Sequence, residues 1–199
     1  MIKAKKSLGQ NFLVDRNILE KIVNVTQIND KTILEVGPGT GNLTSFILKK
    51  KPKKIFVVEK DENLVNHLEE TFKDQLTIIN DDILKINISS LFKSKVTVFG
   101  NLPYNISTEI LSKWITNSTD DLWFNNLILM FQKEVADRII AKFDTSNYGR
   151  LSIISNWKLN VEKICDIKPD CFSPRPKIDS SLLFFLLKKI FLKLKIQKI

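Results

Sequence analysis

Short strand-like and helix-like segments alternate along nearly the whole chain, and this alternation limits the possible folds more than any other feature. The strand-like segments are rich in β-branched and aromatic residues and alternate little between polar and apolar, as expected for strands buried on both faces. They are TILEVG (32–37), KIFVVEK (54–60), LTIIND (76–81), VTVFGN (96–101), NLILMFQ (126–132), VEKICDI (161–167) and SSLLFFLL (180–187). Such a succession predicts an α/β fold with a mostly parallel seven-stranded sheet.

The segments between these strands carry apolar residues at helical spacing, so we expect helices on both faces of the sheet. They are ILEKIVNV (18–25), NLTSFILKK (42–50), ENLVNHLEETF (62–72), STEILSKWI (107–115), KEVADRIIAKF (133–143) and YGRLSIISNW (148–157). Ser107 or Thr108 is the expected N-cap of the fourth helix, because a hydroxyl there can accept a hydrogen bond from the first turn. The last two strands are joined without a helix through residues 168–179, which predicts an antiparallel pair at the sheet edge.

Composition narrows the class of protein. The 199 residues suffice for one full domain, and 43% hydrophobic residues provide material for a core. The net charge of +9 at pH 7 favours a polyanionic partner, nucleic acid before a membrane surface. No apolar run approaches the ~20 residues that span a bilayer, so we expect a cytoplasmic protein without a membrane partner. Two cysteines and a single histidine predict reduced thiols and no metal site.

A glycine-rich turn in ILEVGPGTGNLT (33–44) follows the first strand and leads into a helix. Glycines allow a tight turn and a close approach of the backbone to a ligand. Glu59 closes the second strand, where a carboxylate can bind both hydroxyls of a ribose. The dinucleotide fingerprint requires glycine or alanine at the position of Asn42, so the pattern favours S-adenosylmethionine, which has no pyrophosphate.

Two aspartates follow the third strand in NDDIL (80–84). In a doubly wound sheet this edge faces the same crevice as the glycine turn. We therefore expect Asp82 to accept a hydrogen bond from an adenine amino group, with Ile83 beside the ring. A solvated turn is the alternative, and it has more weight for Asp81 than for Asp82.

The fourth strand ends in NLPY (101–104), at the switch point of the predicted sheet. Pro103 lacks an N–H and holds Leu102 out of the helical region, which fixes the direction of the Leu102 carbonyl. That carbonyl and the side-chain oxygen of Asn101 form a pair of acceptors suited to the exocyclic amino group of a base. Tyr104 offers a ring on which a base can stack. A packed turn is the alternative.

Six motifs together resemble the ribosomal RNA adenine dimethylase family over residues 3–188. They are LGQNFL (8–13), EVGPGTGNLT (35–44), NLPYNIST (101–108), QKEVADRI (132–139), YGRLS (148–152) and FSPRPKIDSS (172–181). The resemblance implies a Rossmann-like class I S-adenosylmethionine-dependent methyltransferase. It is greatest to the small-subunit enzymes, which dimethylate N6 of two adjacent adenosines near the 3′ end of the 16S rRNA. The large-subunit enzymes of the macrolide-resistance type are the near alternative.

The resemblance also implies roles for individual residues. Those assigned to the cofactor are Asn11, Leu13, Gly37, Gly39, Glu59, Lys60, Asp82, Ile83 and Asn101. Those assigned to the target base are Asn101, Leu102, Pro103, Tyr104 and Phe172, with Phe172 stacking opposite Tyr104 on a flipped adenine. Phe172 lies in a Pro-rich loop without an obvious core partner, although a packing role is the alternative. Candidates for RNA phosphate contacts are Lys5, Lys6, Arg138, Arg150, Arg175 and Lys177.

The expected organisation is a methyltransferase domain over residues 1–188, whose basic segment 1–14 closes over the cofactor. Residues 189–199 form a lysine-rich tail where members of the family carry a small helical domain. We expect a monomer that acts on rRNA in the immature small subunit, with the tail as a route to self-association. Two other classes stay open: a ribosome-assembly factor that binds RNA without turnover, and a nicotinamide-dependent oxidoreductase, which Asn42 disfavours.

Overall fold

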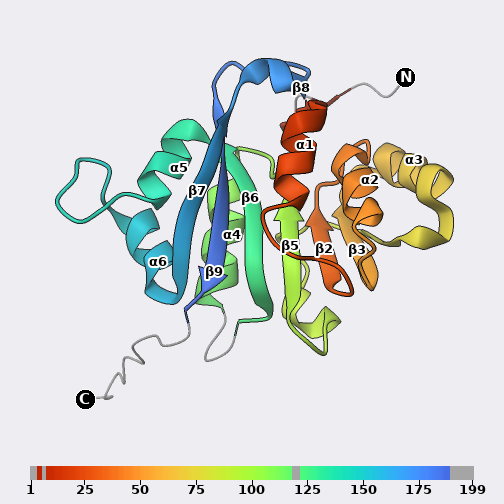
Figure 1. The fold of residues 1–199 in the computed structure, drawn as a ribbon, viewed down its shortest axis with the longest axis horizontal. Helices are drawn as coiled ribbons and strands as arrows, with labels where there is room; N and C mark the ends of the chain where they lie inside the picture. The colour runs from red at the N-terminus through yellow and green to blue at the C-terminus, as the bar shows by residue number, and fades with distance from the viewer. Residues whose placement is uncertain (1–3, 6–7, 118–121, 189–199) are drawn as a thin grey trace.

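The computed structural model describes residues 4–5, 8–117 and 122–188. Its centre is a seven-stranded sheet in the order β4-β3-β2-β5-β6-β9-β7 (Figure 1). The strands are β2 (Thr32–Val36), β3 (Lys54–Glu59), β4 (Thr77–Asn80), β5 (Val96–Gly100), β6 (Phe124–Gln132), β7 (Leu159–Ile167) and β9 (Ser180–Leu187). The predicted α/β fold with seven strands is confirmed.

The pairing directions agree with the expected closing pair. Neighbouring strands from β4 to β6 run parallel. Strand β9 pairs antiparallel with both β6 and β7, so β7 forms the edge. The predicted antiparallel pair at the edge is therefore confirmed, with β9 inserted second from the edge.

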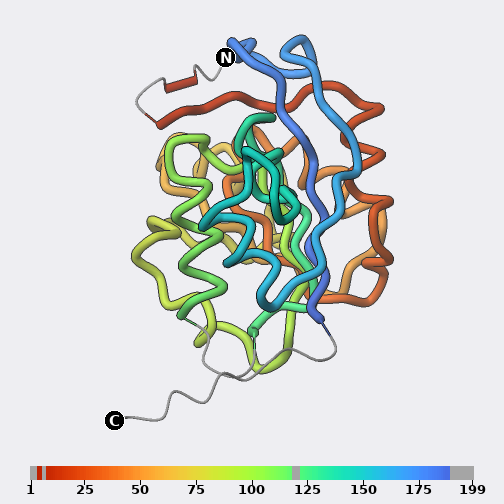
Figure 2. Tube along the Cα trace, turned by 90° about the vertical axis from the view of Figure 1, so that its left-hand side faces the viewer, coloured from red at the N-terminus to blue at the C-terminus, as the bar shows by residue number. Residues whose placement is uncertain are grey.

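Helices cover both faces of the sheet. Apolar residues of α1 and α2 share one core cluster with the sheet, and those of α4 and α5 share another. Figure 2 shows α1 on one side of the sheet and α4 on the other. The helices are α1 (Arg16–Val23), α2 (Asn42–Lys49), α3 (Glu62–Phe72), α4 (Ser107–Thr116), α5 (Lys133–Ile139) and α6 (Arg150–Lys158), with short 3₁₀ turns η2 (Lys73–Gln75), η3 (Ile88–Leu91) and η4 (Pro169–Cys171).

The N-cap of α4 and the end of α5 differ most from the prediction, while other helix ends are shifted by one or two residues. The N-cap of α4 is Ile106, without a side-chain hydrogen bond, so the prediction of Ser107 or Thr108 is wrong. The turn in which the Ile106 N–H donates to the Pro103 carbonyl leads directly into the helix, and this leaves no extended hydroxyl residue to cap it. Helix α5 ends at Ile139 rather than at Phe143, because turn-forming residues of the segment 142–148 follow it.

A second, two-stranded sheet joins segments that are far apart in the sequence. Strand β1 (Phe12–Leu13) pairs antiparallel with β8 (Phe172–Ser173), and Leu13 lies opposite Phe172. This pairing brings the N-terminal segment and the Pro-rich loop to the same end of the molecule. It was not predicted.

Among the described residues, no helix is long and apolar enough to cross a bilayer. Both cysteines are free thiols. The lysine-rich tail, on which the expected self-association depends, lies outside the described residues.

Candidate active site

A cavity of about 200 Å³ lies at the carboxyl ends of β2, β3, β4 and β5. It is lined by the N-terminal segment 8–12, the glycine turn, the end of β3, the loop 81–84 and the loop 101–106, together with Leu64 of α3. Carboxyl ends of parallel strands are where a doubly wound sheet binds its ligand. The predicted cofactor and target-base motifs therefore meet at one place.

The glycine turn has the backbone that its sequence requires. Gly37 and Gly39 have φ angles of 66° and 58°, in the left-handed region that other residues rarely adopt. A Cβ on Gly39 would lie 2.7 Å from the ring of Phe12. The turn is thus packed directly beneath the N-terminal segment, and a side chain on Gly39 would push the two apart.

Glu59 ends β3, is largely buried and lines the cavity. Its carboxylate accepts hydrogen bonds from the backbone N–H groups of Gly39 (3.3 Å), Lys60 (2.9 Å) and Asp61 (2.9 Å). Burial raises the pKa of Glu59, and these three bonds oppose that shift. These hydrogen bonds hold the carboxylate in one orientation. Its contact with the ribose hydroxyls of the cofactor stays a prediction.

Asp82 and Lys60 form an ion pair of 2.9 Å across the mouth of the cavity. The second Asp82 oxygen accepts from the Leu84 N–H at 3.0 Å. The hydrogen bond from Lys60 and that from Leu84 lower the pKa of Asp82, so it is ionised at neutral pH. Each oxygen retains a free lone pair, which leaves Asp82 able to accept from an adenine amino group.

The loop 101–106 is held by specific hydrogen bonds. The Asn101 side-chain Nδ2 donates to the Asn11 carbonyl at 2.7 Å, and Asn101 Oδ1 accepts no hydrogen bond within the described residues. The Tyr104 hydroxyl lies 2.6 Å from Ser180 Oγ at the start of β9. Burial raises the pKa of Tyr104, so its hydroxyl stays protonated at neutral pH.

The N-terminal segment is fastened over the cavity by Asp61, the N-cap of α3. Lys5 Nζ lies 2.6 Å from one Asp61 oxygen, and Gln10 Nε2 donates to the other at 3.0 Å. The phosphate contact of Lys5 stays a prediction, and in this structure its ammonium group is paired with Asp61. Lys6 lies outside the described residues.

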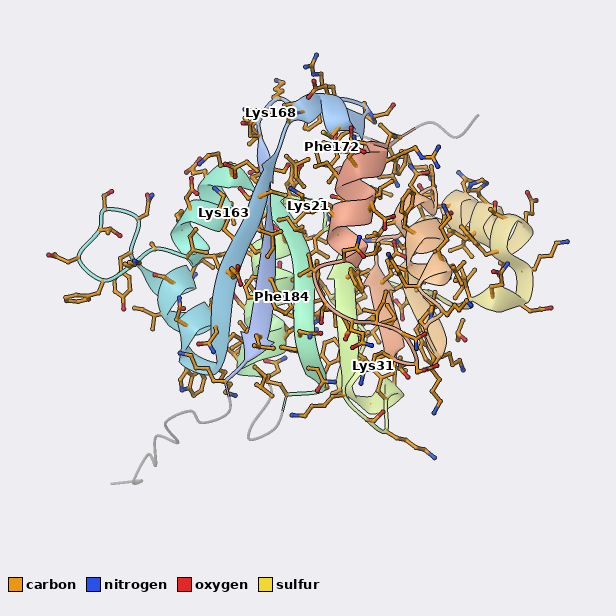
Figure 3. The ribbon with its side chains drawn as sticks, viewed as in Figure 1. Lys21, Lys31, Lys163, Lys168, Phe172 and Phe184 are labelled. Carbon is orange, nitrogen blue, oxygen red and sulfur yellow. The ribbon has the colours of Figure 1, made fainter. Side chains whose placement is uncertain are left out.

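The structure places Leu13 and Phe172 away from the main cavity. Leu13 lines a small neighbouring pocket beside Glu35 and Asn42, and the Asn42 Nδ2 donates to the Leu13 carbonyl at 2.8 Å. Phe172 is only 4% exposed and belongs to the core cluster that contains Leu13 (Figure 3). The expectation that Phe172 lacks a core partner is wrong, because β1–β8 pairing buries its ring.

The other predicted RNA-contact residues are spread over two regions. Arg138 and Arg150 line a separate cavity between α5 and α6. Arg175 and Lys177 are exposed in the segment between β8 and β9, where Arg175 lies 3.9 Å from Asp170.

Several residues of the site were not predicted. Phe12 and Gln10 stand in the motif LGQNFL without having been selected, and the periodicity of the sequence gives no signal for them. Asp61 stands in a charged run, DEN, that indicates only a helix start. Ser180 is buried and is identified as the partner of Tyr104 by its distance alone.

The charges that line the cavity fit a cationic cofactor better than a pyrophosphate. The charged lining residues in the described part of the chain are Glu59, Asp81 and Asp82 against Lys60. An acidic lining favours a sulfonium and an ammonium group, whereas a pyrophosphate requires cations or free backbone N–H groups. The donor set therefore fits S-adenosylmethionine. Within the described residues, no three His, Cys, Asp or Glu side chains gather as metal ligands.

Comparisons with known proteins agree with this geometry. The sequence model described as "Ribosomal RNA adenine dimethylase" matches residues 1–193. The Ribosomal RNA small subunit methyltransferase A of Pelagibacter ubique is 67% identical over 194 residues, which are 98% of this chain and 74% of that protein.

Two solved structures resemble the fold. A dimethyladenosine transferase from Plasmodium falciparum has a TM-score of 0.78 and 30% identity, covering 89% of this chain and 64% of its own. The 23S rRNA methyltransferase ErmE has a TM-score of 0.75 and 23% identity, covering 92% and 72%, a likeness that concerns the fold alone. The predicted Rossmann-like methyltransferase fold is confirmed, and the chain belongs to the ribosomal RNA adenine dimethylase family.

Proposed function

We propose that this chain is an S-adenosylmethionine-dependent enzyme that dimethylates N6 of two adjacent adenosines near the 3′ end of the small-subunit rRNA. The observation that carries the proposal is the orientation of Asn101. Its Nδ2 is committed to the Asn11 carbonyl, and Oδ1 is left as an acceptor on a residue that lines the cavity. Family membership and the name of the relative from P. ubique support the substrate.

The bound cofactor supplies a methyl group on a positively charged sulfur. Asn101 Oδ1 and the Leu102 carbonyl accept the two hydrogens of the adenine amino group and turn its lone pair towards that methyl group. This orientation matters because the lone pair is otherwise delocalised into the ring. No strong base is needed, because the methylated nitrogen becomes acidic and loses its proton to water or to these two oxygen acceptors. The protonated Tyr104 hydroxyl does not serve as the base.

Glu59 would hold the ribose and Asp82 with Ile83 the adenine of the cofactor. Gly37 and Gly39 would lie against its methionine part, while Asn11, Leu13 and Lys60 fix the neighbouring segments. Leu13 contributes through its carbonyl to Asn42, and Lys60 through its ion pair with Asp82. In this arrangement the N-terminal segment acts as a cover over the cofactor.

The aromatic sandwich needs one further condition. Tyr104 lines the cavity, but Phe172 is buried in the core. For Phe172 to stack on the adenine, its ring must turn out of the cluster that it shares with Leu13. We keep Phe172 in the proposal as the second aromatic, with this movement as a requirement. The immature small subunit as substrate implies a cytoplasmic location.

The test uses immature small subunits that lack the modification, radiolabelled cofactor, and three proteins. The wild type should produce labelled dimethyladenosine. Asn101→Ala should lower the rate about 10²-fold or more, because the amino group loses its fixed acceptor. Asn125→Ala removes an exposed amide at the amino end of β6 and should retain the wild-type rate.

Three results would contradict the proposal. Cofactor binding without transfer of label would favour the assembly factor. Label on large-subunit particles alone would favour the macrolide-resistance type. An Asn101→Ala variant as active as the wild type would show that the amide does not position the base.

A further inference from the structure

A second cavity, of about 170 Å³, lies between α5 and α6. It is lined by Arg138, Arg150 and the residues 146–149 and 151. None of these residues lines the active-site cavity. The loop between the two helices projects at the left-hand edge of Figure 1, and Figure 2 views the molecule from that side.

Arginine is concentrated at this cavity relative to the rest of the chain. The chain has only four arginines among its 31 basic residues, and two of them line this one cavity. A guanidinium group binds phosphate through two parallel hydrogen bonds and stacks on flat rings, which an ammonium group does not do. Neither arginine is ion-paired within the described residues. The adjacent Asp137 does not neutralise them, because Lys133 (2.6 Å) and Lys163 (3.4 Å) occupy its carboxylate.

An exposed aromatic pair stands beside the arginines. Phe143 is 81% exposed, the most exposed large apolar side chain of the described residues. Its ring meets that of Tyr148, a lining residue of the cavity, edge to face at 5.6 Å between centroids. Edge-to-face packing holds the orientation of both rings while a face of Phe143 stays open to solvent. Water contact of such a ring is unfavourable, so a partner that covers it gains free energy.

We propose that Arg138, Phe143, Tyr148 and Arg150 form a binding site for one unpaired nucleotide of the RNA substrate. Its base stacks on Phe143, and the adjoining phosphate lies between the two guanidinium groups. Unpaired nucleotides are the form of RNA whose bases can stack on aromatic side chains. This inference rests on the proposed function, because it assumes that the polyanion bound by the enzyme is RNA.

The chemistry separates this partner from others. An RNA duplex bound through its shallow minor groove would contact the arginines but would leave the Phe143 ring exposed to solvent. A protein partner would cover Phe143 without requiring an unpaired phosphate between the arginines. Only an unpaired nucleotide uses both the stacking face and the two cations.

The experiment measures the affinity of the full chain for a labelled, unstructured RNA of about 12 nucleotides over a range of salt. Phe143→Ala should weaken binding about tenfold through lost stacking and leave the salt dependence unchanged. Arg150→Gln and Arg138→Gln should each weaken binding and lower the slope of log K against log salt by about 0.7 for a lost phosphate contact. Lys31→Gln removes the same charge next to the amino end of β2, away from the loop between α5 and α6 (Figure 3). It should change neither the affinity nor the slope by a comparable amount.

The outcomes distinguish this site from the proposed function. Arginine variants that lower the slope together with a neutral Phe143→Ala would overturn the stacked nucleotide, because the arginines would then contact phosphates without a stacked base. A Phe143→Ala effect on particles but not on free RNA would overturn it in favour of a protein. Wild-type RNA affinity in all variants, with methyl transfer intact, would overturn the site and leave the proposed function standing. If the variants change RNA affinity as predicted but the wild type transfers no methyl group, the nucleotide site would stand and the proposed function would be overturned.

Discussion

Asp61 is the residue through which the N-terminal segment is held over the cofactor cavity, so replacing it tests whether that segment is a cover. Its side chain is only 2% exposed and contacts Lys5 at 2.6 Å and Gln10 at 3.0 Å. In Asp61→Asn, the amide oxygen can still accept from the Asn63 N–H and cap α3, because asparagine is as good an N-cap as aspartate. The new NH₂ group then faces the Gln10 donor. Helix α3 therefore keeps its N-cap, while the N-terminal segment loses its contacts with residue 61.

The size of the effect follows from the two contacts that are lost. The Lys5 side chain is 44% exposed, so water screens the ion pair and its contribution is about 0.5–1 kcal/mol. The hydrogen bond from Gln10 adds about 1 kcal/mol. If the cofactor binds only beneath the closed segment, a loss of about 1.5–2 kcal/mol weakens its affinity about 10- to 30-fold. Calorimetric titration with the cofactor measures this, and Asp74→Asn, at an exposed site, controls for the loss of one negative charge.

A double-mutant cycle with Lys5→Gln decides whether the contacts act together. The cycle should give a coupling free energy of about 0.5–1 kcal/mol between positions 5 and 61. Burial alone would raise the pKa of Asp61, but hydrogen bonds from Lys5 and Gln10 outweigh it and lower the pKa. Because the pKa of Asp61 is lowered, the stabilisation from its contacts is fully present above the ordinary pKa range of aspartate. It is lost as pH falls through the lowered pKa. Wild-type cofactor affinity in Asp61→Asn, or purely additive effects, would refute the reasoning.

Two further predictions concern buried groups around the glycine turn. Burial raises the pKa of Glu35 to about 7 despite a hydrogen bond from Thr44, so the wild type should lose stability as pH rises from about 4.5 to about 7. Glu35→Gln should remove that slope in denaturant titrations, and an equally steep variant would contradict the assignment. Gly39→Ala should lower stability by at least about 1–2 kcal/mol and weaken cofactor binding, because of its positive φ and the contact of its Cβ with Phe12. Gly149→Ala meets nothing within 4 Å, so thermal denaturation should leave it close to wild type.

The main sheet could be predicted because each strand carries its own signal. Runs such as 32–36 and 96–100 are short, β-branched and followed by glycine or a polar loop, and both form strands over those residues. The glycine turn, Glu59, Asp82 and Asn101 follow from the same pattern, since the carboxyl ends of parallel strands meet at one edge. For these residues, position along the chain determines position in space.

The long-range contacts that hold the segments of the site in place could not be predicted in this way. Strands β1 and β8 have two residues each, too few to show a period, and they come from opposite ends of the chain. Asp61 resembles any acidic residue at a helix start, although it binds a lysine 56 positions away. The burial of Phe172 depends on the pairing of β1 with β8, so an analysis of its own loop could only suggest that it is free. Contacts between distant segments, without local periodicity, are what sequence patterns omit.

Three parts of the site are joined through residues 11–13. In the proposed function, this arrangement links the position of the N-terminal segment over the cofactor to the position of Phe172. The Asn11 carbonyl holds the Asn101 amide, and the Leu13 carbonyl holds Asn42 at the start of α2. Leu13 also lies opposite Phe172 in the β1–β8 pair. Because one short segment, residues 11–13, makes all three contacts, a movement that frees the Phe172 ring must either break the β1–β8 pairing or turn the side chain alone. Breaking the pairing would also disturb the Asn101 amide that we propose receives the target, so rotation of the ring with the backbone pairing kept is the movement compatible with the proposed methyl transfer.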